Sequence, residues 1–217
     1  QPRLCVGVWS KGLPGHAGNT DSKGWPDRPA PRTRLWHRSA GRMADPLGNV
    51  SDPQHSALGD GIHRQLGATW KQWRKAIEQI PPDHWRTGDI DYLIPARHAL
   101  HVINTVHGYC RHEQAESWNG LTDEFFGRSL DWEGTAADEL PDQTQCLAYL
   151  EHVGDLTRAW LDGLSDEEIL SPQEAFPWTG PNLLSRMIYV IRHSQDHSGQ
   201  LNAELRRRDL PRSAWET

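Results

Sequence analysis

Hydrophobic side chains that recur every three or four residues dominate this chain from about Ser56 onward. The first such stripe consists of Ile62, Leu66, Trp70, Trp73, Ile77 and Ile80. It ends at Pro81-Pro82, because proline interrupts helical hydrogen bonding. Similar stripes indicate three further helices, over about 91–112, 142–164 and 181–208. No alternating pattern typical of β-strands lies between them. Four long amphipathic helices without strands predict an all-α fold, a four-helix bundle.

The connection between the second and third helices, residues 113–141, is unusually long and rich in glycine and acidic residues. Connections of that length are uncommon and often cover functional sites, so we expect this segment to form the roof of a site. A short extra helix is expected at "SDEEIL", where Ser165 is the N-cap and Glu168 follows three residues later.

Residues 1–50 differ from the rest in composition. They contain eight Lys/Arg against three Asp/Glu, together with seven Gly and six Pro, and they show no sustained apolar period. Such a segment buries too little apolar surface to offset its ordering entropy, which predicts a disordered N-terminal extension. We take Met43 as the natural start, which makes the preceding residues non-native upstream sequence. Residues 51–217 are expected to form the bundle.

Charge and composition exclude several classes of protein. Residues 51–217 carry fifteen Lys/Arg against twenty-six Asp/Glu, a surplus that repels a phosphate backbone and argues against nucleic-acid binding. No stretch approaches the ~20 apolar residues of a membrane span. The three cysteines, Cys5, Cys110 and Cys146, have neither metal nor redox spacing, so a reducing, cytoplasmic location is expected. Walker, Gly-x-Gly-x-x-Gly and Gly-x-Ser-x-Gly sequences are absent, which argues against nucleotide and flavin cofactors.

Two of the twelve histidines, His193 and His197, stand four residues apart within the fourth predicted helix. This spacing places both imidazoles on one face, where two neutral rings can hold one divalent metal ion. A third ligand must come from another helix. The second helix offers four histidines, which are His98, His101, His107 and His112.

The run "YVIRHSQDHSGQLNAELRRRDLPRSAW" resembles the last helix of the DinB-like superfamily, the DNA-damage-inducible and thiol-transferase-like four-helix bundles. The resemblance covers about residues 56–215 and implies that His193 and His197 are metal ligands. The family's remaining histidine precedes an aromatic residue by eight positions. In "LHVINTVHGYC" this register implies His101, with Tyr109 as the aromatic residue and His98 as the alternative.

The chain departs from the family pattern at His107, where relatives often have an acidic residue. Metal-bound imidazoles usually need an acceptor for their second ring nitrogen, and Asn104 or a backbone carbonyl is expected to take that role here. A structural metal site would instead be closed by a fourth ligand, such as Glu204 or His107.

The resemblance implies a metal-dependent enzyme that joins a low-molecular-weight thiol, such as bacillithiol, mycothiol or glutathione, to an electrophilic substrate. The alternatives are a metal-dependent hydrolase and a non-catalytic metal-binding stress protein. We expect zinc or nickel, and iron or manganese would also suit imidazole ligands. A homodimer is a further expectation for bundles of this kind, and no catalytic residue is assigned beyond the ligands.

Overall fold

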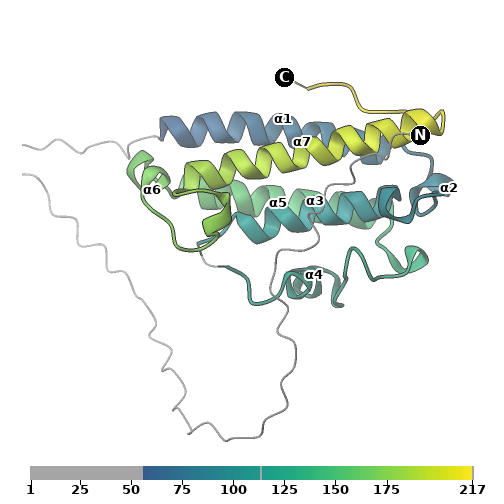
Figure 1. The fold of residues 1–217 in the computed structure, drawn as a ribbon, viewed down its shortest axis with the longest axis horizontal. Coiled ribbons are helices and arrows are strands. Elements are labelled where there is room, and N and C mark those ends of the chain that lie inside the picture. Colours follow the sequence, from purple (N-terminus) through teal and green to yellow (C-terminus); the bar gives the residue numbers. More distant parts are fainter. Residues whose placement is uncertain (1–55, 113, 217) are drawn as a thin grey trace, which may run out of the picture. The chain divides into compact units, whose positions relative to one another are not determined.

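The computed structural model describes residues 56–112 and 114–216, so the predicted extension over 1–50 lies outside the described residues. Four long helices form the bundle: α1 (Ala57–Gln79), α3 (Pro95–Tyr109), α5 (Gln143–Asp162) and α7 (Leu183–Arg207) (Figure 1). Short helices join them: α2 (Pro82–Trp85), η1 (Asp91–Leu93), α4 (Trp118–Phe126), η2 (Ala137–Glu139), α6 (Asp166–Leu170) and η3 (Pro177–Thr179). The described residues contain no strand, so the all-α prediction is confirmed. None of their helices has the length and apolarity that crossing a membrane requires.

The helix starts follow from local capping chemistry. Ser56 accepts the backbone N–H of Gly59 at the start of α1, where its own hydroxyl donates to Asp166 at the start of α6. Asp142 and Gln145 form a reciprocal capping box at α5. The capping box predicted for the short sixth helix is present, between Ser165 and Glu168.

Around the bundle, α1 packs against α5 and α7, and α3 packs against the same two helices. Because Gln143 at the start of α5 donates to the carbonyls of Ile77 and Ile80, α1 and α5 are antiparallel. By contrast, α1 and α7 are parallel, since Thr69 pairs with Gln195 and Gln72 with Ser198. The long link from α3 to α5 lets these two neighbours also run in the same direction, as crossover connections do in bundles.

Helix α3 is the central helix. Every one of its residues except His101 is buried, which is typical of a helix covered on all sides. Helix α4 closes one side of it, and the contact is so close that a Cβ on Gly108 would lie 1.9 Å from the Trp118 ring.

A chain of hydrogen bonds joins α3, α4 and α5. The Tyr149 hydroxyl donates to Asn104 Oδ1 at 2.9 Å. Its oxygen therefore accepts from His107, whose Nδ1 carries a proton and lies 2.9 Å away. Asn104 Nδ2 donates to the Trp118 carbonyl at 3.0 Å. The polar side chains on this side of α3 are thus engaged in holding α4 and α5.

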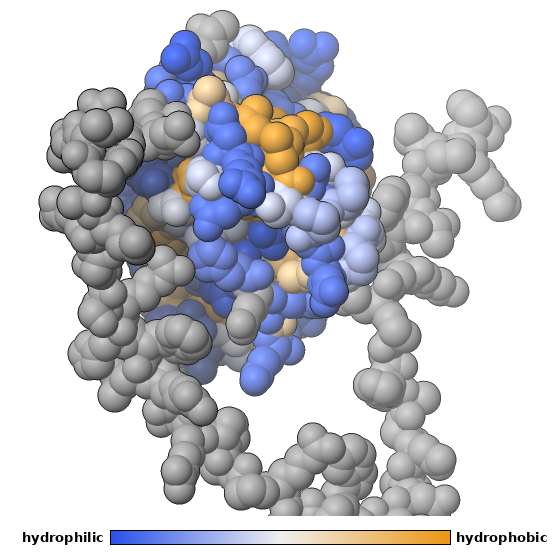
Figure 2. Space-filling view, turned by 90° about the vertical axis from the view of Figure 1, so that its left-hand side faces the viewer, coloured by the Kyte–Doolittle hydropathy of each residue, from blue (hydrophilic) through white to orange (hydrophobic). Residues whose placement is uncertain are grey.

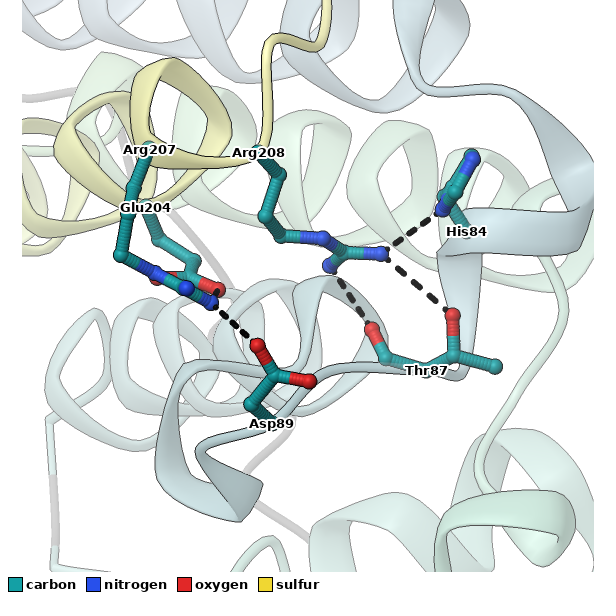
Figure 3. A network of polar contacts seen from close by, with 6 residues as sticks. All are labelled: His84, Thr87, Asp89, Glu204, Arg207 and Arg208. Atoms are coloured by element: carbon teal, nitrogen blue, oxygen red, sulfur yellow. Dashed lines mark hydrogen bonds and ion pairs between the residues drawn. The ribbon is translucent and has the colours of Figure 1, made fainter.

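The C-terminal end of α7 is tied to the segment between α2 and η1 (Figure 3). Arg207 donates hydrogen bonds to Glu204 within its own helix and to Asp89 in the segment between α2 and η1. Arg208 donates to the Thr87 carbonyl at 2.8 Å and to His84 Nδ1 at 2.9 Å. These contacts fix where α7 ends relative to the start of α3.

The opposite end of the bundle, where α6 lies, carries hydrophobic side chains on its surface (Figure 2). Leu170 on α6 and Ile188 on α7 are each about half exposed.

Candidate metal centre

The antiparallel pairing of α3 and α7 brings together histidines from distant parts of the sequence. His193 and His197 lie one turn apart on α7 and face His101 on α3. One ring nitrogen from each of the three lies within 4.8 Å of the others. His101 is the one residue of α3 that is not buried, so the central helix is accessible to solvent at the three-histidine group.

The three rings touch edge to face. The Nε2 atoms of His101 and His193 are 3.1 Å apart, and the ring centroids of His101 and His197 are 4.6 Å apart. Nitrogen lone pairs that face one another at such a distance repel unless a proton or a cation lies between them. Nitrogens bound to one metal ion at ~2.0–2.1 Å are themselves ~3.0–3.4 Å apart, so these residues fit a divalent ion after small movements.

All three imidazoles are neutral at pH 7. Burial lowers the pKa of His193 to about 4 and that of His197 to about 3. Desolvation by the surrounding side chains, together with the neighbouring histidines, lowers the pKa of His101 well below its ordinary value. Neutral rings have the free lone pair that metal binding requires, so the site needs no deprotonation step.

The alternative histidine, His98, takes a different role. It is almost fully buried, and its Nε2 lies 3.3 Å from the Gln200 side-chain oxygen. Gln200 in turn donates to Asp196 at 2.9 Å. The structure therefore groups His101, and not His98, with His193 and His197.

The predicted fourth ligands are engaged elsewhere. Both carboxylate oxygens of Glu204 accept from Arg207 at 2.8 Å, and His107 bonds Tyr149. Within residues 56–112 and 114–216, the group contains three histidines and no carboxylate. An ion held by these three histidines alone would keep open coordination positions, an arrangement typical of catalytic metal sites.

The expectation that Asn104 supports a bound imidazole is wrong. Its side chain is occupied by Tyr149 and the Trp118 carbonyl, on the side of α3 that faces α4 and α5. The second ring nitrogen of His197, Nδ1, is buried without a hydrogen-bond partner.

Aromatic side chains from other segments surround the group. Trp132, from the link between α4 and η2, lies over His101 with ring centroids 4.0 Å apart. Arg97 on α3 holds this roof, since it donates to the Trp132 carbonyl and pairs with Asp91. Tyr189 stacks parallel to His193. The expected roof over the site is present, but Trp132 and Arg97 were not predicted individually, because no local sequence pattern links them to the histidines.

A comparison with protein-family models matches residues 65–201 to the DinB superfamily. The matched range contains all three histidines of the group. A comparison with curated proteins gives no match.

Proposed function

Because the chain belongs to the DinB superfamily, we propose that it is a divalent-metal-dependent enzyme that transfers a low-molecular-weight thiol to an electrophilic substrate. One observation carries this proposal: three neutral imidazole nitrogens lie within 4.8 Å of one another without a carboxylate among them. His101, His193 and His197 are the proposed ligands, and zinc or nickel is the proposed ion, with iron or manganese as alternatives.

Three neutral ligands leave the charge of a divalent ion uncompensated, and that charge would lower the pKa of a thiol held beside it. Aromatic and basic side chains of the protein surround the three proposed ligands. Trp132 covers His101 and limits the access of water, while Arg97 fixes the backbone of that roof. Tyr189 stacks on His193 and holds the orientation of its ring.

Metal analysis of the purified protein tests the site. We expect about one divalent ion per chain in the wild type and at least ~10-fold weaker binding in His193→Ala, because loss of even a supporting residue has an effect of that size. His63→Ala is the matched control, since this α1 histidine bonds Asp162 outside the group. Equal metal affinity in the two variants would refute the ligand assignment.

The reaction is tested by pairing electrophiles, such as an aryl chloride, with bacillithiol, mycothiol or glutathione. We expect thiol consumption that disappears with the metal and in His193→Ala. Cleavage of ester or amide substrates without thiol consumption would favour a hydrolase. A metal-loaded protein that is inactive in both assays would favour a non-catalytic metal-binding role.

A further inference from the structure

A hollow of about 710 Å³ lies between α4, the C-terminal end of α3 and the second half of α5. Its lining includes His107, which follows His101 by six residues. That separation places the two side chains about 120° apart around α3 and ~9 Å apart along its axis. The hollow is therefore distinct from the three-histidine group and faces another side of the central helix.

Hydrogen-bond donors without partners gather at the wall of this hollow. Thr157 lines it, is 3% exposed, and its hydroxyl has no hydrogen-bond partner. The hydroxyl lies near the Cys110 thiol but makes no bond of normal geometry with it, and burial raises the pKa of Cys110 to about 12. The indole Nε1 of Trp160 is likewise unpaired. Buried polar groups in native proteins nearly always have a partner, so a cluster of unpaired ones at one cavity points to a missing acceptor.

Two arginines lie at the same wall, and neither forms an ion pair within the described residues. Arg111 lines the hollow and makes no ion pair or hydrogen bond with the described part of the chain. Arg186 lies behind the wall, with its guanidinium 5.4 Å from the centre of the Trp160 ring and 4.8 Å from that of Phe176. It is 4% exposed, two of its nitrogens are unpaired, and no ion pair within residues 56–112 and 114–216 includes it. Buried charges are normally paired, so the guanidinium of Arg186 lacks the anion that such a group usually has.

The rest of the lining is suited to an apolar body. Leu121 on α4 and Leu156 on α5 belong to it, and the Trp160 ring adds a flat face. Two carboxylates, Glu116 and Glu124, also line the hollow, but both are exposed to solvent and screened by it.

We infer that this hollow is a binding site for an organic carboxylate with a flat apolar body. Its carboxylate pairs with the guanidinium of Arg111, and it reaches the hydroxyl of Thr157 and the indole N–H of Trp160 when these buried donors turn toward the hollow. The apolar body packs against Leu121 and Leu156. A single carboxylate suits this site better than a phosphate, because one accessible guanidinium and two neutral donors match one negative charge.

Isothermal titration calorimetry of the full chain with phenylacetate tests the inference. We expect a dissociation constant of about 1 mM or tighter, at least tenfold weaker binding of the neutral analogue phenylacetamide, and no binding of the cation phenethylamine. Equal affinity for the acid and the amide would overturn the inference. So would the absence of heat up to about 10 mM phenylacetate, which would leave water as the partner of the buried donors.

Two variants locate the site. Arg111→Gln should weaken phenylacetate binding at least tenfold, while the control Arg158→Gln, on the exposed side of α5, should not. Thr157→Val keeps the side-chain shape but removes the hydroxyl, so it should weaken binding about fivefold without lowering the stability of the ligand-free protein. Unchanged binding in both Arg111→Gln and Thr157→Val would refute the site.

The same titration on His193→Ala separates this inference from the proposed enzyme function. Phenylacetate should bind this variant as it binds the wild type, because α3 lies between the two sites. A loss of binding that follows the loss of metal would place the carboxylate at the three-histidine group instead and contradict the inference.

Discussion

At the scale of single residues, the fold lowers the pKa of several histidines and so keeps their imidazoles unprotonated. His107 is an example outside the three-histidine group, because burial and the nearby charge of Arg111 lower its pKa to about 4. In the unfolded chain the ordinary value of about 6.5 returns. Between pH 6.5 and pH 4 the unfolded state therefore binds the additional proton, and the free energy of unfolding falls as the pH falls.

This gives a prediction for His107→Gln. The contribution of His107 is fully present above about pH 6.5 and is lost as the pH falls toward 4. The wild type should thus lose more unfolding free energy between pH 7 and pH 5 than the variant, by about 1 kcal/mol, since water in the adjoining hollow screens part of the effect. Urea unfolding at each pH, with metal removed, measures the difference, and parallel pH curves would contradict the prediction.

Only part of the candidate metal centre is predictable from the sequence. The spacing of His193 and His197 is a local helical property and is visible in the sequence. The choice of His101 over His98 depends on the register between α3 and α7, and the family resemblance supplied the register that the structure has. Trp132 could not be assigned, because its place above His101 depends on the path of an irregular segment.

At the scale of helices, α4 is the element that sequence analysis overlooked. Its signals are present: Ser117 caps its start, Gly127 takes a left-handed conformation at its end, and its apolar residues have helical spacing. A helix of nine residues is marginal alone, so its stability comes from packing against α3 rather than from propensity. The four long helices were predictable because each carries its own apolar residues at helical spacing and a start signal, a capping side chain in α1, α5 and α7 and Pro95 in α3.

The contact between α4 and α3 predicts the effect of Gly108→Ala. The new Cβ would lie 1.9 Å from the Trp118 ring, so α4 must move, and we expect a loss of about 1–3 kcal/mol in unfolding free energy. Gly67→Ala on α1 is the matched control, because nothing lies within 4 Å of its Cβ. That variant should gain up to about 1 kcal/mol through helix propensity. Chemical denaturation of both variants checks the opposite signs, and equal effects would show that α4 does not pack as described.

At the scale of the whole molecule, the proposed ligands link two helices that are far apart in the sequence. A metal that binds the folded state alone should therefore stabilise the entire bundle. At 100 times its dissociation constant the ion adds about 2.7 kcal/mol, which corresponds to a rise in Tm of roughly 5–10 °C for a chain of this size. Differential scanning calorimetry with zinc or nickel measures the rise, which should be absent in His101→Ala and reversed by a chelator. An equal rise in His101→Ala would place the ion elsewhere.

The parallel pairing of α1 with α7 has a consequence for how the protein is made. The two helices are the first and last of the bundle, and 128 residues separate Gln79 from Arg207. At the 5–20 residues per second of translation, α1 leaves the ribosome roughly 6–26 s before α7 is complete. During that interval Trp73 and Ile77 lack one of the surfaces that later bury them. The three-histidine group cannot assemble in that interval either, because two of its members, His193 and His197, lie on the last helix to emerge.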